Sequence, residues 1–302
     1  MQAEYDSLIS KGTWVLTNLP LDHIPIKCKW IYKTKTKAYG SFDKFNARLV
    51  VKEYSQVTGV DYHDTFSHVV HMTSIHVLLA FATQFDLEIH QMDVKTAFLN
   101  GDLKEEIYME QPKGFLVPGK EHLVCHLHRA LYGLKQASRA WYIKIDLFLT
   151  SKGFMFCSSD PNLYIKQEGV LFLILALFVD DTILVSNNLE FMQFTILGEI
   201  HSCLGIQVQC HREKGLLFLC QTKFIEDIIE KFGLEKAHST NTPCLVSSTK
   251  YGATAHNEAL ATSQPFANLI GCLKFVGLNI RLDILFMANF LGQYLASPSI
   301  GH

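Results

Sequence analysis

The sequence predicts an α+β protein in which an antiparallel sheet packs on helices, and three observations lead to this class. Residues 170–186 hold two short apolar runs separated by an Asp-Asp pair, which is typical of a β-hairpin with carboxylates at its turn. Residues 27–52 have a second hairpin pattern, in which basic stretches flank Tyr39-Gly40-Ser41. Several further segments carry apolar residues at helical spacing. Strands and helices are therefore both expected.

The elements can be predicted in chain order. A helix is expected at 3–9 and a strand at 14–16, followed by the basic hairpin at 27–52. The apolar stripe of 73–85 predicts a helix that Thr73 or Ser74 can cap. A strand is expected at 125–129, and a helix from about 138 buries Trp141, Ile145, Phe148 and Leu149 and ends at Gly153. A further amphipathic helix at 222–232 ends at Gly233.

The Asp180–Asp181 pair is the first candidate for chemistry. The ten apolar residues before it are too few to span a bilayer, which takes about 20. Buried strands would hold two like charges side by side, and a hard divalent cation with oxygen ligands neutralises such a pair best. A site for two metal ions needs a third carboxylate, and Asp93 offers it at the end of a strand expected at 87–92. The alternative is an ordinary turn, because Asp favours turns.

Three motifs in this order carry a family resemblance: QMDVKTAFLNG, LYGLKQASRAW and FVDD. Together with KWIYKTKTKAYGSFDKFNARLVVKEYSQ, GVDYHDTFSHVV and EEIYMEQPKGF, they resemble the reverse transcriptase of copia-type LTR retrotransposons. The resemblance implies a polymerase right hand with fingers, a palm of antiparallel sheet packed on helices, and a partial thumb. It implies a reverse transcriptase domain at 13–246. At 247–302 it implies a linker and the start of the connection to a ribonuclease H domain, before which the sequence stops.

The same resemblance implies a mechanism and its residues. Asp93, Asp180 and Asp181 would hold two Mg²⁺ ions, with Mn²⁺ as a substitute, for attack of a primer 3′-hydroxyl on a dNTP. The implied partners are an RNA template, a DNA primer and dNTPs. By this resemblance, Arg48 would contact the triphosphate, and Phe98 would be the aromatic gate that rejects a 2′-hydroxyl. The remaining implied nucleotide ligands are Lys135 and Gln136, and the implied nucleic-acid contacts are Lys33, Lys35, Arg139, Leu204 and Gly205.

Each of these residues has a plainer alternative when only the sequence is considered. The basic hairpin has a single acid, Asp43, and suits phosphate binding, but its lysines can equally form a solvated face. Phe98 can be a core aromatic residue. Lys135, Gln136 and Arg139 can be polar residues at a helix start that face solvent.

Departures from the family leave a second function open. Asn46 and Glu53 stand where the family usually has Lys and Gly, which weakens the positive charge beside phosphates. Residues 187–196 are too few for the helix and return strand that a palm needs, so we expect an internal deletion that uncovers one sheet face. The alternative function is a decayed, non-catalytic remnant that binds nucleic acid through residues 27–52.

Composition sets broader limits. The chain has 302 residues, of which 48% are hydrophobic and 19% are charged, a balance typical of globular proteins. Its formal net charge of −2 is less basic than is usual for nucleic-acid-binding proteins. Eight cysteines show no C-x-x-C or zinc spacing, and neither a signal peptide nor a membrane span is recognisable. We expect an intracellular protein with reduced thiols, in a cytoplasmic particle or the nucleus, and without a membrane partner.

Overall fold

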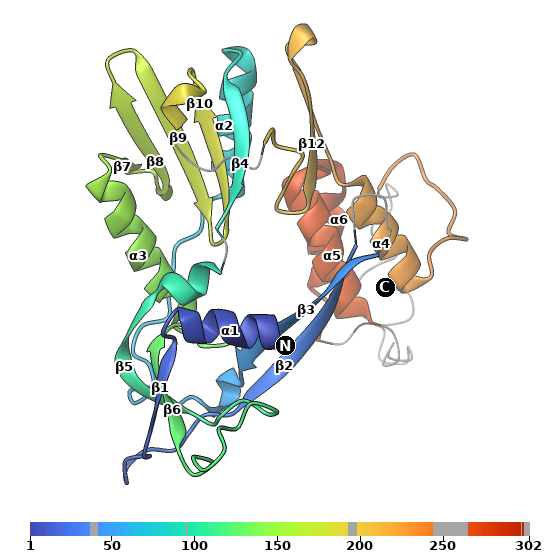
Figure 1. Cartoon of the computed structure of the whole chain (residues 1–302). Helices are drawn as coiled ribbons and strands as arrows, with labels where there is room; N and C mark the ends of the chain where they lie inside the picture. The colour runs from blue at the N-terminus through green and yellow to red at the C-terminus, as the bar shows by residue number, and fades with distance from the viewer. Residues whose placement is uncertain (37–41, 95, 193–197, 244–264, 297, 299–302) are drawn as a thin grey trace. The chain divides into compact units, whose positions relative to one another are not determined.

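The computed structural model describes residues 1–36, 42–94, 96–192, 198–243, 265–296 and 298 (Figure 1). Two compact units divide the chain: residues 1–78 with 87–198, and residues 79–86 with 199–302. Every pair of strands described in either unit is antiparallel. The sequence prediction of helices combined with antiparallel sheets is confirmed.

The first unit contains two sheets and a separate hairpin. One sheet has the strand order β4-β10-β9-β8-β7 and the other has the order β1-β6-β5, while β2 and β3 pair only with each other. Its strands are β1 (Trp14–Thr17), β2 (Cys28–Thr36), β3 (Phe42–Val51), β4 (Glu88–Asp93), β5 (Asp102–Met109), β6 (Val124–Arg129), β7 (Met155–Cys157), β8 (Asp160–Glu168), β9 (Leu171–Phe178) and β10 (Asp181–Ser186). Its helices are α1 (Gln2–Ser10) and α3 (Ala137–Ser151), with short 3₁₀ turns η1 (Glu53–Ser55), η2 (Ala97–Asn100) and η3 (Glu190–Met192).

Two hydrophobic cores hold this unit together. The first joins α1, the β1-β6-β5 sheet and the end of β3, and includes Leu8, Ile26, Leu49, Met109 and Leu127. The second lies between α3 and the five-stranded sheet, and includes Leu149, Leu173, Leu175, Leu184 and Met192. Removing such large side chains from water is the main stabilising contribution to a fold of this size.

The predicted buried stripe of α3 is only partly correct. Trp141 and Leu149 are buried and Ile145 is half-buried, but Phe148 is 45% exposed. Periodicity predicts which side of a helix is apolar, but it does not tell how far the neighbouring sheet extends over that side. The helix ends as predicted, since Lys152 is its C-cap and Gly153 follows with a φ of +84°.

Helix α2 (Met72–Gln84) begins one residue before the predicted 73–85 range, so neither Thr73 nor Ser74 is its N-cap. That part of the prediction is wrong. The carboxylate of Asp160, on β8, accepts hydrogen bonds from the His71 backbone N–H at 2.9 Å and from the Ser74 side chain. A carboxylate distant in sequence therefore accepts hydrogen bonds from groups at the start of the helix, where backbone N–H groups have no partner within the helix.

The predicted loss of cover over the palm-like sheet is wrong for its central strands. Leu175 and Leu177 on β9 are buried, and so are neighbours that point to the opposite face, such as Ala176, Ile183 and Val185. Residues 187–192 contribute Phe191 and Met192 to the core with α3, and residues 193–197 lie outside the described part. The sheet therefore keeps most of its cover.

The second unit has a small sheet in the order β11-β12-β13 and several helices. These elements are β11 (Ser202–Cys203), β12 (Ile206–His211), η4 (Arg212–Lys214), β13 (Leu216–Cys220), α4 (Thr222–Phe232), α5 (Phe266–Asn279) and α6 (Leu282–Gly292). Helix α4 has the predicted bounds, and Gly233 ends it with a φ of +64°. The predicted linker falls mostly on residues outside the described part. Among the described helices, none has the length and apolar character needed to cross a membrane.

Candidate active site

The Asp-Asp pair lies at a tight turn between β9 and β10, as the sequence predicts. Phe178 and Asp181 are paired across the hairpin, so Val179 and Asp180 form the turn itself. On its other side β10 pairs with β4, and the register puts Asp93 opposite Asp181. The β9–β10 hairpin and β4, a strand distant from it in sequence, thus bring the three predicted carboxylate positions to one end of one sheet.

The structure describes the backbone of Asp93 but not its side chain. Among the side chains that are described, no three His, Cys, Asp or Glu lie close enough to hold a metal ion. Carboxylate oxygens are nevertheless the ligands that Mg²⁺ prefers, so the residue types of Asp93, Asp180 and Asp181 fit such an ion.

Two contacts from outside the hairpin fix its turn. The indole Nε1 of Trp141, on α3, donates to the Val179 carbonyl at 2.8 Å, and the Val94 N–H donates to the Asp180 carbonyl at 2.9 Å. Val179 has a φ of +54°, which β-branched residues rarely adopt. Such a conformation costs on the order of 1–3 kcal/mol and persists only when neighbouring contacts hold it. Trp141 and Val94 provide those contacts.

An aromatic residue that sequence analysis missed connects two predicted nucleotide ligands. The Tyr132 ring lies under the Arg48 guanidinium, whose Cζ is 4.6 Å from the ring centroid. The same ring meets Phe98 edge-on, with centroids 5.0 Å apart. Phe98 is half-buried against the first core, so both interpretations of this residue, gate and core aromatic, are compatible with its position. The LYGLKQ motif contains Tyr132, but nothing in its spacing indicates these partners.

Lys11 is a second residue that the sequence gave no reason to select. Its Nζ donates to the hydroxyl of Thr96 and to Asn100 Oδ1, the latter at 3.4 Å. Burial lowers the pKa of Lys11, and the nearby Arg129 charge lowers it further. Lys11 therefore ties the end of α1 to the segment that leads from Asp93 to Phe98.

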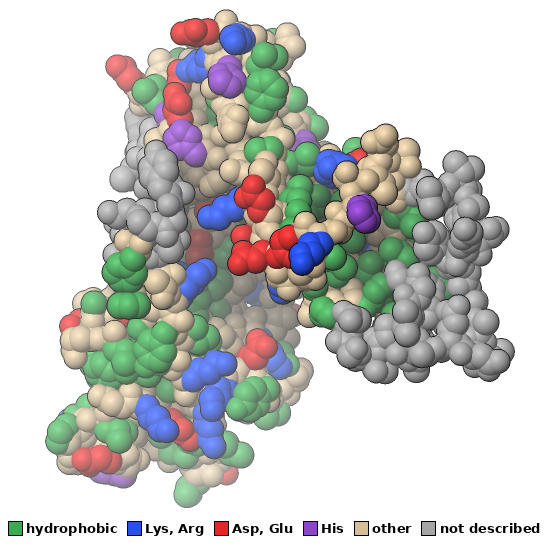
Figure 2. Space-filling model, turned by 90° about the vertical axis from the view of Figure 1, so that its right-hand side faces the viewer, with side chains coloured by type: hydrophobic (Ala, Val, Ile, Leu, Met, Phe, Trp, Pro, Cys, Tyr) green, Lys and Arg blue, Asp and Glu red, His purple; other side chains and the backbone are tan. Residues whose placement is uncertain are grey.

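The basic hairpin is confirmed as a two-stranded ribbon of β2 and β3, with its tip at 37–41 outside the described residues. Lys33 and Lys44 are exposed, and Lys33 pairs across the ribbon with Asn46. Lys35 pairs with Lys44, but the Lys35 side chain is not described. Figure 2 shows basic side chains mixed with acidic and hydrophobic ones rather than gathered into one continuous stripe.

The base of this hairpin is closely packed. The Val51 N–H donates to the Tyr132 carbonyl at 2.8 Å. Gly133 has a φ of +88°, and a Cβ at this position would collide with the Val51 carbonyl oxygen. Glycine is required here both for the backbone conformation and for the close approach of the two chains.

Gln136 and Lys135 are already engaged within the protein. Gln136 is buried; its Nε2 donates to the Asp61 carbonyl at 2.7 Å and its Oε1 accepts from Gln56 Nε2 at 3.0 Å. The Lys135 Nζ donates to the Tyr62 hydroxyl at 3.0 Å, and the pKa of Tyr62 is lowered by hydrogen bonds from Thr58 and Lys135. These contacts hold the 56–62 loop against the start of α3.

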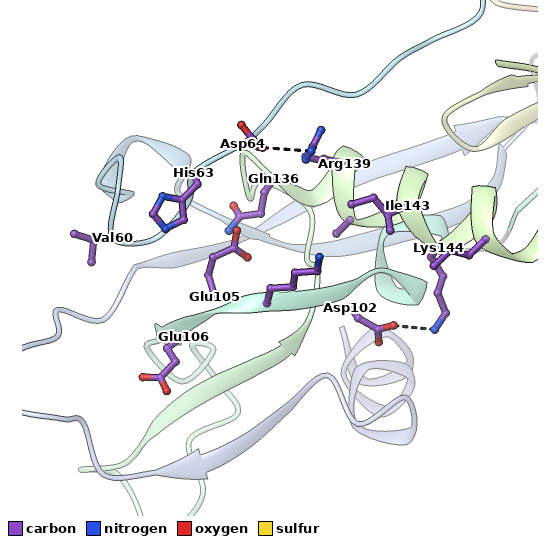
Figure 3. Close-up of a pocket in the computed structure, with 13 residues that line it drawn as sticks. Val60, His63, Asp64, Asp102, Glu105, Glu106, Gln136, Arg139, Ile143 and Lys144 are labelled. Atoms are coloured by element: carbon purple, nitrogen blue, oxygen red, sulfur yellow. Dashed lines mark hydrogen bonds and ion pairs between the residues drawn. The ribbon is translucent and has the colours of Figure 1, made fainter. Parts of the chain in front are cut away.

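A pocket of about 710 Å³ opens beside Arg139, between the 60–64 loop, β5 and α3 (Figure 3). Arg139 pairs with Asp64 at 3.3 Å and donates to the Phe66 carbonyl at 3.1 Å. Lys144 pairs with Asp102 at 2.8 Å. Further acidic side chains in its wall are Glu105 and Glu106. Among the described residues of the wall, four acids face three Lys or Arg residues, Lys104 being the third, and Arg139 and Lys144 are paired, so the pocket does not suit a polyphosphate.

Leu204 and Gly205 form the two-residue turn between β11 and β12 in the second unit. Both have positive φ, +50° and +78°, as a tight hairpin turn requires. The two implied nucleic-acid contacts thus lie in a hairpin turn, while their contact with a primer stays a prediction.

Comparison with known proteins identifies the family. A family model described as "Reverse transcriptase (RNA-dependent DNA polymerase)" matches residues 11–246. The chain belongs to this reverse transcriptase family. Over its full length it is 38% identical to the Retrovirus-related Pol polyprotein from transposon TNT 1-94 of Nicotiana tabacum. It is 33% identical to those from transposons RE1 and RE2 of Arabidopsis thaliana.

The resemblance to copia-type reverse transcriptases is thereby confirmed. The reverse transcriptase chain spans only 24% of the tobacco polyprotein and 21% of each Arabidopsis one. Reverse transcriptases generally use divalent metal ions and bind template, primer and dNTPs.

Proposed function

We propose that this chain is an RNA-directed DNA polymerase domain that transfers dNTPs onto a primer 3′-hydroxyl with the help of two Mg²⁺ ions. The observation that carries the proposal is the strand register: Asp93 lies opposite Asp181, and Asp180 occupies the adjoining turn. These three residues would hold the ions. When bound, Mg²⁺, or Mn²⁺ in its place, lowers the pKa of the 3′-hydroxyl and stabilises the charge on the triphosphate.

The other residues of the proposed site bind and orient the substrates. Arg48 would contact the triphosphate, and its position over Tyr132 supports this role because the ring limits the directions that the guanidinium can take. Phe98 would exclude a 2′-hydroxyl by its bulk. Lys33 and Lys35 would bind phosphates of the nucleic acid, and the turn of Leu204 and Gly205 would contact the primer end.

The proposed layout is a right hand. The β2–β3 hairpin belongs to the fingers, the five-stranded sheet with α3 forms the palm, and α4 begins the thumb. The reverse transcriptase domain would occupy 13–246, and 247–302 would be a linker and the start of a connection.

The proposed palm is shortened. The alignments with the plant polyproteins extend over 314–318 residues, whereas this chain has 302, so these relatives contain residues with no counterpart here. Residues 187–192 contain only the 3₁₀ turn η3 in the structure. The longer alignments support a shortening of this chain, and the single 3₁₀ turn in residues 187–192 supports a place for it after β10.

A second candidate function is nucleic-acid binding without catalysis. It is favoured by the engagement of Gln136, Lys135 and Arg139 in contacts within the protein. In that case binding would depend on the exposed lysines of β2 and β3 and weaken steeply with added salt.

Primer extension on poly(rA)/oligo(dT) with Mg²⁺ and dTTP tests the proposal. We expect extension by the wild-type protein and at least a thousandfold loss in Asp180→Asn, because a neutral amide neither neutralises nor holds a metal ion as a carboxylate does. Absence of extension by folded protein that still binds the duplex would contradict catalysis and leave the binding function. Absence of both would contradict both.

A further inference from the structure

The segment that joins Asp93 to Phe98 contains a residue in an unusual backbone conformation. Thr96 has a φ of +55° and a ψ of +45°, in the left-handed region, and it directly precedes the turn η2, which carries Phe98. Threonine rarely adopts this conformation because its side chain is branched at Cβ. Contacts with neighbouring groups therefore have to hold Thr96 in place.

Two contacts within the segment close the turn at Thr96. The Leu99 N–H donates to the Thr96 carbonyl at 3.0 Å, and Asn100 Nδ2 donates to the same carbonyl at 3.4 Å. Leu99 is buried in the first core. These contacts fix the far end of the turn, and they engage the Thr96 carbonyl rather than its side chain.

Lys11 contacts the side chain of Thr96 from another part of the chain, 85 residues away. Its Nζ donates to the Thr96 hydroxyl and to Asn100 Oδ1, the latter at 3.4 Å. Because Asn100 also donates to the Thr96 carbonyl, Lys11 is linked to Thr96 both directly and through Asn100. One half-buried ammonium group thus bridges the two ends of η2.

The backbone that carries Lys11 is itself fixed. Lys11 is the C-cap of α1, and its N–H donates to the Ser7 carbonyl at 3.2 Å. Thr13 is buried, and its hydroxyl donates to the Leu8 carbonyl at 2.7 Å. Leu8 is buried in the first core. A side chain that starts from such a fixed backbone can restrain the turn that it contacts.

The position of Thr96 bears on the position of Phe98, two residues later. A rotation about the Thr96 backbone would move η2, and with it the Phe98 ring that meets Tyr132 edge-on. Exclusion of a 2′-hydroxyl by bulk requires the ring at contact distance from the sugar, and a displacement of about 1 Å is enough to change such a selection strongly.

We propose that Lys11 is a positioning residue for nucleotide selection. By holding Thr96 it sets the place of the Phe98 ring, and so the rejection of ribonucleotides in favour of dNTPs. The inference rests on the proposed polymerase function and extends it, because it gives the end of α1 a part in choosing the sugar.

The test compares incorporation of dTTP and UTP on poly(rA)/oligo(dT) by the full chain. In Lys11→Met we expect the ratio of kcat/KM for dTTP to that for UTP to fall about 5–20-fold, mainly because UTP is used better. The kcat for dTTP should stay within about twofold of wild type. A purely structural role of Lys11 would instead lower the use of both nucleotides and leave the ratio unchanged. Lys11→Arg keeps a cationic donor and should restore most of the ratio.

Lys152→Met is the matched control. Lys152 is also a lysine at the C-cap of a helix, α3, and it is also followed by a glycine, but it is exposed. Its replacement should leave the ratio unchanged. A fall equal to that of Lys11→Met would show a general effect of removing a helix-end lysine and would overturn the inference.

Thr96→Val removes the acceptor of the Lys11 contact and keeps the shape of the side chain. It should lower the ratio as Lys11→Met does, and the double variant should show no further fall, because both changes remove one contact. Independent, multiplying effects would contradict the shared contact. Urea unfolding shows whether Lys11→Met is folded, and if it is not, Thr96→Val alone decides.

Phe98→Ala distinguishes failure of the inference from failure of the proposed function. If Phe98→Ala loses the selection while Lys11→Met and Thr96→Val keep the wild-type ratio, the inference is overturned and the proposed function stands. If Phe98→Ala keeps the ratio, Phe98 is not the gate and the inference is wrong with it. Absence of extension with dTTP by the folded wild type would overturn both the proposed function and the inference.

Discussion

Two hairpins of the first unit, β9–β10 and β2–β3, have opposite construction. The β9–β10 hairpin is central in a five-stranded sheet, its strands are largely buried, and Trp141 and Val94 hold its turn. The β2–β3 hairpin pairs with no other described strand, exposes Lys33 and Lys44, and is held by contacts at its base with Tyr132 and Gly133.

This difference matches the chemistry proposed for each hairpin. Metal ions require ligands fixed within a fraction of an ångström, so the carboxylates come from buried strands whose register cannot slip without exposing apolar side chains. Phosphate binding through lysines acts over longer distances and tolerates motion. We therefore expect substitutions to lower the free energy of unfolding in the β9–β10 hairpin and at the base of the β2–β3 hairpin. Substitutions of the exposed lysines on β2 and β3 should not lower it.

The largest loss of stability is expected for a substitution at the base of the β2–β3 hairpin. Gly133→Ala places a Cβ against the Val51 carbonyl and forces alanine into a φ of +88°. We expect a loss of at least about 3 kcal/mol in the free energy of unfolding, measured with urea. Gly169→Ala is the matched control, because its φ is +62° with no atom near the added Cβ, and it should cost only about 1 kcal/mol. Equal costs for the two would contradict the packed base.

The next largest loss of stability is expected at Trp141, which contacts the β9–β10 turn, and it can be compared with the loss at Trp30 in the β2–β3 hairpin. Trp141 is buried and donates to Val179, whereas Trp30 on β2 is only partly buried and donates to the Lys113 carbonyl at 3.1 Å. Trp141→Phe should cost about 2–3 kcal/mol because it leaves a strained turn and a vacated volume. Trp30→Phe should cost about 1 kcal/mol or less. Urea unfolding of both variants gives the comparison, and a reversed order would contradict the account of the turn.

The third prediction concerns the pH dependence of stability at Asp160, on β8, the strand beside the β9–β10 hairpin. Burial alone would raise the pKa of Asp160, but hydrogen bonds from His71, Ser74 and Asn162 outweigh it, and the pKa is lowered. A carboxyl with a lowered folded-state pKa stabilises the protein above its unfolded pKa, about 3.9 for Asp, and loses that contribution as pH falls through the folded-state value. Asp160→Asn should therefore cost about 1–2 kcal/mol at pH 7 and progressively less below about pH 4.

Urea unfolding of the wild type and Asp160→Asn between pH 3 and 7 provides the measurement. A constant difference over this range would show that the charge of Asp160 is not what stabilises the start of α2. In the part of the chain that the structure describes, no ion pair joins Lys33 or Lys44 to a carboxylate, so Lys33→Gln should show no such pH dependence.

The smallest effect on stability is expected for Lys33→Gln on the exposed ribbon. The free energy of unfolding should change by less than about 0.5 kcal/mol. Binding to a primer–template should weaken, and the slope of log K against log salt should fall by about 1 if Lys33 contacts a phosphate. Lys120→Gln, an exposed lysine in a loop, is the control and should leave the slope unchanged. An unchanged slope for Lys33→Gln would remove the ribbon from the proposed interface.

The sequence by itself determined the local elements and the family. Apolar periodicity indicated α3 and α4, and Gly153 and Gly233 marked their ends. Apolar runs on either side of Asp180-Asp181, and basic stretches on either side of Tyr39-Gly40-Ser41, indicated the two hairpins. These features depend on neighbours within a few residues, so a linear pattern contains them. The motifs around Asp93 and Asp180 were likewise enough to indicate the reverse transcriptase family.

Only the tertiary structure decided which of these elements meet. Asp93 lies opposite Asp181 because β4 pairs with β10. Asp160 accepts a hydrogen bond from the His71 N–H, 89 residues earlier, at the start of α2, and Tyr132 joins Arg48 to Phe98. It also decided that Gln136 is buried. Such contacts are determined by the packing of whole elements against each other, and the local spacing of residues carries no information about that packing.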